Sequence, residues 1–163
     1  MSLIHLFQKT HLLSGIATNL LEQLEPHTQR IVVEPAYNET KLLISSKDSS
    51  GPDLYLVLEG EVTLDQEKKE VGLATSREVT SLEEELFGEV SWLLQRPRIA
   101  DVFTSSRAVL LRINGKAFTQ WLQANPEATS LVWQRIATAL ALRLVQTYAE
   151  NQSHKELIKI FQF

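Results

Sequence analysis

The sequence contains no cysteine, and that absence removes several kinds of chemistry. None of the 163 residues is Cys. The chain can therefore form neither a disulfide framework nor a thiolate metal site, and it has no thiol nucleophile. A chain without disulfides fits a reducing compartment, which leads us to expect the cytoplasm.

Long apolar runs and clusters of basic residues are also missing. No run approaches the roughly 20 apolar residues of a membrane span, and the N-terminus lacks the basic start and apolar stretch of a signal peptide. The chain has 16 Lys and Arg residues against 20 Asp and Glu residues, which gives a net charge of −4. A nucleic-acid-binding protein usually carries a basic face instead. We therefore expect neither a membrane nor a nucleic acid as a partner.

The sequence offers no motif for catalysis or for metal binding. It has no nucleophile elbow and no phosphate loop of the Gly-Lys-Ser/Thr type. No pair of carboxylates has a spacing that indicates acid–base work. The four histidines lie far apart and lack the ligand-type spacing of a metal site: His5, His11, His27 and His154. The sequence therefore predicts no enzyme, no metal and no cofactor.

What the chain does contain is typical of a globular domain with a single core. It has 163 residues, of which 44% are hydrophobic and 22% are charged, and these are ordinary values for one such domain. Short runs of β-type residues, bounded by Gly, Pro, Asp, Asn or Ser, fill the middle of the chain. They cover residues 30–34, 41–45, 53–59, 61–65, 70–74, 77–81, 99–104 and 107–113.

Many successive strands without helices between them predict antiparallel pairing, in a barrel or a jelly roll. The turn residues at 59–62 lie between two of these runs and predict a hairpin. Further along, the run Glu83-Glu84-Glu85 is expected to form a solvated loop.

Apolar residues at helical spacing predict one helix before the strands and two after them. The first covers residues 12–25, with Ser14 as its cap and Pro26 after its end. The second covers residues 114–126, with Asn114 as its cap.

The third helix is expected from about residue 127 to 150. One domain would then cover residues 1–150, with the strands at about 30–113 and the closing helices at about 114–150. Residues 151–163 read as a tail, with a polar hinge and a short apolar end, and no role is assigned to it.

The last predicted helix carries two apolar stripes. One consists of Val132, Ile136, Leu140 and Leu144, with Trp133 and Tyr148 beside it. The other consists of Leu131, Leu142, Val145 and Ala149. A helix that rests on one sheet needs only one apolar stripe. The second stripe is covered either by the tail or by a second copy of the helix, and we favour a homodimer through the 127–150 helix.

Residues 86–102 combine groups that suit a ligand with a hydroxyl at one end and an anion at the other. Glu89 offers acceptor oxygens for a sugar hydroxyl, and Arg98 offers a fixed positive fork for a phosphate. Gly88 and Ala100 are small enough for a close approach of the backbone. A nucleotide carries both groups. Each residue alone also has a purely structural explanation, because the Glu can pair locally and the Arg can be solvated.

Taken together, Phe87, Gly88, Glu89, Pro97, Arg98 and Ala100 resemble the phosphate-binding cassette of cyclic nucleotide-binding domains. Residues 12–24 are similar to the leading helix of that family, 51–64 to its glycine hairpin and 118–144 to its two closing helices. The resemblance covers the chain from about residue 10 to 150 and implies a Crp/Fnr-like effector domain without a DNA-binding domain. The implied fold is mainly β, a double-stranded β-helix or jelly-roll β-roll with an N-terminal helix and two C-terminal helices.

The resemblance also implies roles for single residues. Glu89 would bind the ribose 2′-hydroxyl and Arg98 the cyclic phosphate, and the backbone of Gly88 and Ala100 would assist. The last helix covers the base in many members of the family. Helical position therefore suggests three base-facing residues: Arg143, Leu144 and Thr147.

Two departures from the family pattern affect the expected ligand. Ile99 follows the Arg and has no hydroxyl for a guanine amino group, which predicts cAMP over cGMP because an unpaired buried donor is costly. Residues 82–102 contain five acidic residues and only two arginines. The negative electrostatic potential that they create does not favour the binding of an anion. Without a ligand, Arg98 is expected to pair with one of these acids.

Two classes of function follow. The chain is either a regulatory module that senses a cyclic nucleotide and signals through its C-terminal helix, or a degenerate member that acts as a dimerising interaction module. Some members of the family append a DNA-binding domain after the long helix. Only 13 residues follow Glu150, which are too few for such a domain.

Overall fold

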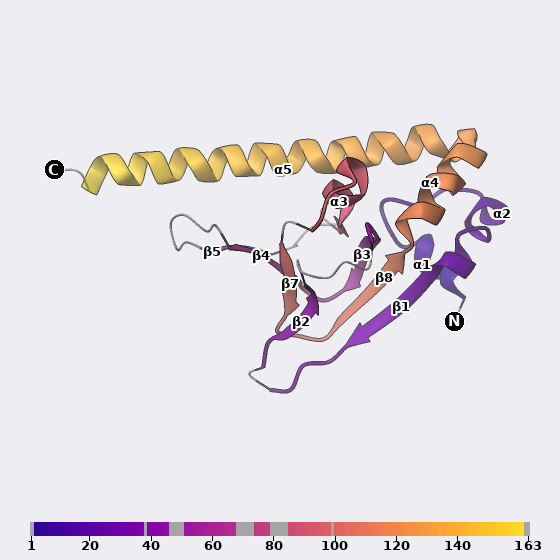
Figure 1. Cartoon of the computed structure of the whole chain (residues 1–163), viewed down its shortest axis with the longest axis horizontal. Coiled ribbons are helices and arrows are strands. Elements are labelled where there is room, and N and C mark those ends of the chain that lie inside the picture. The colour runs from indigo at the N-terminus through magenta and orange to yellow at the C-terminus, as the bar shows by residue number, and fades with distance from the viewer. Residues whose placement is uncertain are drawn as a thin grey trace.

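The computed structural model describes residues 2–37, 39–45, 51–67, 74–78, 85–98 and 100–161. Short helices come first, the strands follow, and two longer helices close the described chain (Figure 1). The N-terminal elements are α1 (Leu3–Phe7), α2 (Thr18–Leu21) and a 3-10 turn (Glu25–His27). The strands are β1 (Thr28–Val33), β2 (Lys41–Ile44), β3 (Leu54–Glu59), β4 (Thr63–Glu67), β5 (Ala74–Glu78), β6 (Leu86–Phe87), β7 (Asp101–Thr104) and β8 (Ala108–Ile113). The remaining helices are α3 (Glu89–Leu94), α4 (Gly115–Ala124) and α5 (Pro126–Phe161).

The strands form two antiparallel sheets that face each other. Their orders are β1-β8-β3-β6 and β2-β7-β4-β5. Strand β8 is central to the first sheet and pairs with β1 and β3, in a register that sets Ile113 opposite both Thr28 and Leu54. This arrangement confirms the predicted jelly-roll fold, mainly β with helices on either side of the strands in the sequence.

The first sheet supplies both halves of the core. Side chains alternate between the two faces of a strand, so Leu54 and Leu56 of β3 pack toward the helices, while Tyr55 packs between the sheets. The helical side of the core gathers large residues from α4 and α5, among them Phe118 and Ile136. The cassette begins in β6, which pairs with β3 through Tyr55 and Phe87.

The predicted N-terminal helix over residues 12–25 is wrong in extent. Only α2 is helical in that range, and no side chain caps it. Gly15 has a φ of 75°, a left-handed conformation that ends a right-handed helix. Leu21 and Leu24 are nevertheless buried, which explains the helical spacing of the apolar residues.

The predicted hairpin at residues 59–62 is also wrong. Strand β3 pairs with β6 and β8, whereas β4 pairs with β5 and β7. The turn between β3 and β4 therefore carries the chain from one sheet to the other. The expected strands at 70–74 and 77–81 overlap with β5, and residues 70–73 and 79–81 lie outside the described residues.

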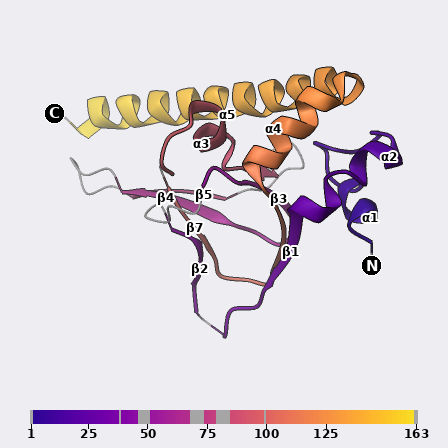
Figure 2. The same cartoon turned by 45° about the vertical axis from the view of Figure 1, so that its right-hand side comes forward.

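The two closing helices begin as predicted, but the second is longer. Asn114 caps α4, because its side chain accepts a hydrogen bond from the backbone N–H of Ala117 at 2.9 Å. Helix α5 continues to Phe161, so the expected hinge after residue 150 is wrong. Neither Gly nor Pro follows Pro126, and the sequence therefore contains no strong helix breaker. Both views show α5 running over α3 and along one side of the roll (Figures 1 and 2).

Candidate ligand-binding site

The cassette begins with a tight contact between Gly88 and strand β3. Gly88 has a φ of 84° and precedes the first residue of α3. A Cβ atom at this position would lie 2.6 Å from the backbone carbonyl oxygen of Asp53. Strands β3 and β6 pair next to this contact. Tyr55 lies opposite Phe87, and their rings stack with centroids 5.0 Å apart. The close approach expected of Gly88 is thus observed.

Arg98 extends across the same region. Its Nη2 donates a hydrogen bond of 3.1 Å to the carbonyl oxygen of Gly51, and its guanidinium carbon lies 5.1 Å from the ring centroid of Tyr55. Its Nε is buried and has no hydrogen-bond partner among the residues that the structure describes. No described carboxylate pairs with Arg98, which contacts a backbone carbonyl and an aromatic ring; two of the expected acids, Glu83 and Glu84, lie outside the described residues.

Glu89 is the first residue of α3 and is only 2% exposed. Its carboxylate accepts a hydrogen bond from Nη1 of Arg143 on α5. The Nη2 of Arg143 donates to the carbonyl oxygen of Leu86 in β6, two residues before the cassette glycine. The structure therefore joins Glu89 to a residue that the sequence suggested for the base.

The other suggested residues take different positions. Ala100 is buried at the end of the cassette. Ile99 lies outside the described residues. Leu144 is 61% exposed, and Thr147 is exposed as well. The structure thus brings Gly88, Glu89, Arg98 and Arg143 together in one region and leaves Leu144 and Thr147 on the surface.

One residue of the acidic run before the cassette, Glu85, is not solvated as expected. Glu85 is buried and accepts a hydrogen bond of 2.9 Å from the backbone N–H of Leu12. Burial raises the pKa of Glu85, although the bond from Leu12 and the charge of Arg135 act in the opposite direction. Glu83 and Glu84 lie outside the described residues.

Arg135 on α5 completes this arrangement. Its Nη1 donates hydrogen bonds to the carbonyl oxygens of Leu12 and Ser14, at 3.1 and 2.8 Å. Burial lowers the pKa of Arg135, while the charge of Glu85 raises it. The segment between α1 and α2, the residue just before β6 and helix α5 therefore meet at one place. No pattern near residue 85 in the sequence indicates this, since the partners are far along the chain.

Asp53 is a third buried carboxylate near the cassette, and the sequence analysis missed it. It forms an ion pair of 2.6 Å with Arg112 of β8 and accepts a hydrogen bond of 3.1 Å from the backbone N–H of Gly115. Trp92 fixes α3 from the other side, because its indole N–H donates to the carbonyl oxygen of Gly115 and its ring stacks on Trp133 at 5.5 Å. The cassette is therefore held by α4, α5 and β8.

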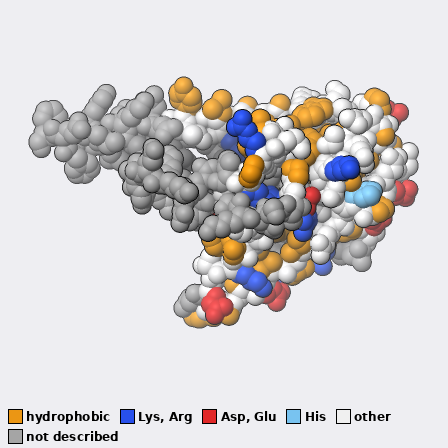
Figure 3. Space-filling view, viewed as in Figure 1, with side chains coloured by type: hydrophobic (Ala, Val, Ile, Leu, Met, Phe, Trp, Pro, Cys, Tyr) orange, Lys and Arg blue, Asp and Glu red, His pale blue; other side chains and the backbone are white. Residues whose placement is uncertain are grey.

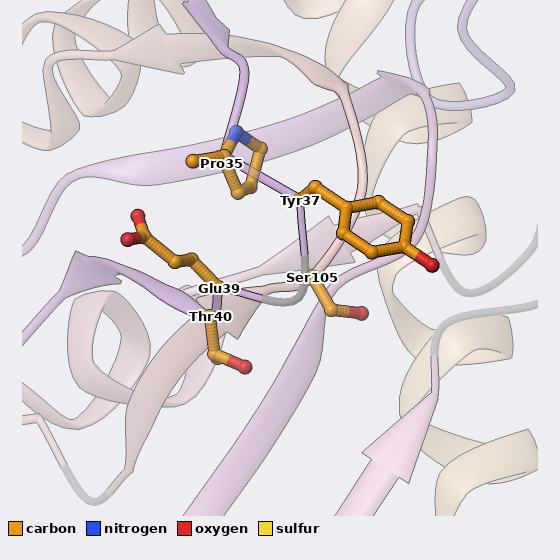
Figure 4. Close-up of a pocket in the computed structure, with 6 residues that line it drawn as sticks. Pro35, Tyr37, Glu39, Thr40 and Ser105 are labelled. Carbon is orange, nitrogen blue, oxygen red and sulfur yellow. The ribbon is translucent and has the colours of Figure 1, made fainter.

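A separate hollow of about 570 Å³ lies at the connection between β1 and β2 (Figure 4). It is lined by Pro35, Ala36, Tyr37, Glu39, Thr40 and Ser105. Tyr37 is 93% exposed, and none of the lining residues is a buried charged group. This hollow therefore lacks the buried polar group that a specific ligand site needs.

Two further features were sought within the described residues. No three His, Asp or Glu side chains there gather closely enough to hold a metal ion. No helix in that part of the chain is long and apolar enough to cross a membrane.

Comparison with known proteins places these features in a family. The family model of the cyclic nucleotide-binding domain matches residues 36–125, more than half of the chain. This chain therefore belongs to the cyclic nucleotide-binding domain family. Domains of this family are regulatory.

Individual relatives agree with this assignment. Potassium channel AKT1 of Oryza sativa subsp. indica is 30% identical over 125 residues, which is 74% of this chain but only 12% of the channel. The chain thus spans about an eighth of that relative's length.

Two solved structures share the fold. The catabolite activator protein of Thermus thermophilus is 24% identical, with a TM-score of 0.64 over 88% of this chain and 62% of that one. The regulatory domain of Toxoplasma gondii PKA with cAMP is 13% identical, with a TM-score of 0.62 over 82% of this chain and 48% of that one. The fold is therefore the Crp-like jelly roll.

Proposed function

We propose that this chain is a regulatory module that binds a cyclic nucleotide, with Arg98 on the cyclic phosphate and Glu89 on the ribose 2′-hydroxyl. The observation that carries the proposal is the buried Nε of Arg98, which has no acceptor among the described residues. A buried donor without an acceptor is costly. A phosphate oxygen would satisfy it through a charge-assisted hydrogen bond.

The surroundings of Arg98 support an anion site. The carbonyl of Gly51 and the ring of Tyr55 hold the guanidinium in place, so little ordering is needed when a ligand binds. Gly88 lies beside it, and a Cβ atom there would come within 3.4 Å of Nη1 of Arg98. The absence of this Cβ atom leaves that side of the guanidinium unobstructed.

We propose cAMP as the preferred ligand. Ile99 has no hydroxyl to accept from the guanine amino group of cGMP. The T. gondii relative is in complex with cAMP, which makes cAMP the first ligand to test.

We propose that the module signals through helix α5. This helix contacts the cassette at Glu89 and carries exposed apolar side chains further along, Leu144, Val145 and Tyr148. Figure 3 shows hydrophobic side chains along the edge of the molecule where α5 lies. We propose that a second copy of the chain covers them, which gives a homodimer. A non-catalytic role, a cytoplasmic location and the absence of a nucleic-acid partner stay predictions from the sequence.

One observation favours the alternative, a dimerising interaction module that binds no nucleotide. The carboxylate of Glu89 is already engaged by Arg143, and the suggested base-facing residues Leu144 and Thr147 are exposed. In that case the cassette would serve only to fix α5 on the roll.

Calorimetric titration and thermal unfolding with cAMP, cGMP and 5′-AMP separate the two functions. The regulatory module should bind cAMP more tightly than cGMP, and saturating cAMP should raise the melting temperature, because a ligand that binds only the folded state stabilises it. The linear 5′-AMP serves as a control for general nucleotide binding. If neither cyclic nucleotide binds or shifts the melting temperature, the interaction module is the correct function.

A further inference from the structure

The buried carboxylates around the cassette each lie near an arginine. Among the described residues these carboxylates are Asp53, Glu85 and Glu89. Asp53 pairs with Arg112, Glu85 lies in the field of Arg135, and Glu89 pairs with Arg143. Arg98 differs, since no carboxylate in the described part of the chain pairs with it.

These carboxylate–arginine pairs change the net charge expected at the site. Five acids against two arginines in residues 82–102 suggested a field that does not favour an anion. Arg143, from a helix distant in sequence, neutralises the acid nearest to the ligand contacts. Glu89, Arg143 and Arg98 together then carry a single net positive charge. A cyclic phosphate carries a single negative charge, so the two are complementary.

The role of Arg143 follows from the burial of Glu89. The side chain of Glu89 is 2% exposed, so water cannot neutralise its charge. Without Arg143, an anionic ligand would enter a site that already holds an uncompensated carboxylate. Like charges brought together at a desolvated site are strongly unfavourable.

We propose that Arg143 is the counter-ion of Glu89 and a positioning residue for ligand binding, and that it makes the cassette site able to accept an anion. This inference rests on the proposed function and deepens it. Arg143 acts through Glu89: it neutralises the carboxylate, and its second nitrogen fixes the guanidinium on the carbonyl of Leu86. Because Arg143 belongs to α5, the docking of that helix and the binding of the ligand favour each other, and this coupling is reciprocal.

A double-mutant cycle tests the inference. The variants are Arg143→Gln, Glu89→Gln and the double variant, each titrated with cAMP in the calorimeter. Arg143→Gln alone should weaken cAMP binding by at least about tenfold, because the buried carboxylate loses its counter-ion. In the Glu89→Gln background the same substitution should change the affinity by less than about threefold, since no charge is left to neutralise.

Other outcomes overturn the inference. An equal loss in both backgrounds would mean that Arg143 contacts the ligand directly, and no loss in either would mean that no counter-ion is needed. Arg143→Lys keeps the charge and should recover most of the affinity that Arg143→Gln loses. A folded lysine variant that binds as weakly as the glutamine variant would also contradict the proposal. Thermal unfolding of each variant confirms that it is folded.

Hydrogen exchange of the α5 backbone provides a second readout. Saturating cAMP should slow exchange around residue 143 in the wild type and have no such effect in Arg143→Gln, measured at cAMP concentrations that saturate both proteins. The same slowing in both proteins would contradict the coupling. The titration of the wild type separates the two claims: no binding rejects the proposed function, whereas binding without the expected pattern rejects only the role of Arg143.

Discussion

Glu85 shows how burial changes the behaviour of a single residue. It lies in a run of three glutamates, yet its carboxylate is buried against the backbone of Leu12. Burial penalises the charged form and raises the pKa above the usual value of 4.5. The ionised carboxylate is therefore more costly in the folded chain than in the unfolded chain.

The pH dependence of stability follows from this shift. The ionised Glu85 carboxylate destabilises the folded state. This destabilisation is absent below pH 4.5, grows as the pH rises from 4.5 to the raised pKa of the folded state, and is complete above that value. Glu85→Gln carries no charge at any pH, and its amide oxygen can still accept from Leu12. The stability of the variant relative to wild type should therefore increase as the pH rises through this window. Urea unfolding at a series of pH values measures it, with Glu22→Gln as an exposed control. A difference that is constant or that falls with pH would contradict this account.

Gly88 gives a second prediction at the scale of the residue. Gly88→Ala places a side chain in a left-handed conformation and 2.6 Å from the carbonyl oxygen of Asp53. Gly15→Ala is a matched control, because Gly15 has a φ of 75° and nothing lies within 4 Å of its added Cβ. The control should lose about 1–2 kcal/mol from the conformation alone, and Gly88→Ala should lose clearly more. Equal free energies of unfolding would show that the contact with Asp53 does not matter.

At the scale of the element, the strands were predictable and their partners were not. Runs such as residues 53–59 and 107–113 are rich in β-type residues and are bounded by turn residues, which defines β3 and β8 well. The pairing of β3 with β8 joins segments that no local pattern connects. The hairpin predicted at 59–62 was wrong for this reason, since a turn motif does not reveal that the chain changes sheets.

Helix α5 is another element whose partner the local sequence does not reveal, and it leads to a prediction. Its first apolar stripe is buried as far as Ile136, whereas Val145 of the second stripe and Tyr148, beside the first, are each 66% exposed. If a second copy covers these residues, Val145→Glu with Tyr148→Glu should convert a dimer into a monomer, because paired carboxylates cannot be buried in an apolar interface. Sedimentation measures the mass, and Thr147→Glu is a control for an added charge on the same turn. A wild type that sediments as a monomer at high micromolar concentration would exclude the dimer.

At the scale of the whole molecule, the site combines segments from most of the chain. The cassette was predicted from the resemblance of Phe87, Gly88, Glu89, Pro97, Arg98 and Ala100 to a family pattern, supported by three further matching segments in the same order. The charge partners were not predictable, because Arg135 and Arg143 come from α5, and Arg112 comes from the central strand of the first sheet. The fold brings these arginines to the cassette carboxylates and leaves Arg98 without a carboxylate partner among the described residues.

The most direct test of this account is the calorimetric titration of cAMP into the wild type, Arg98→Ala and Arg107→Ala. Arg107 is a matched control, an exposed arginine that pairs with Glu34 and Glu59. Removal of Arg98 leaves the buried phosphate without its cation, so the affinity should fall by about 2–5 kcal/mol, roughly 30-fold or more. Arg107→Ala should bind as the wild type does. If Arg98→Ala binds cAMP as tightly as the wild type, Arg98 does not hold the phosphate and the central claim is wrong.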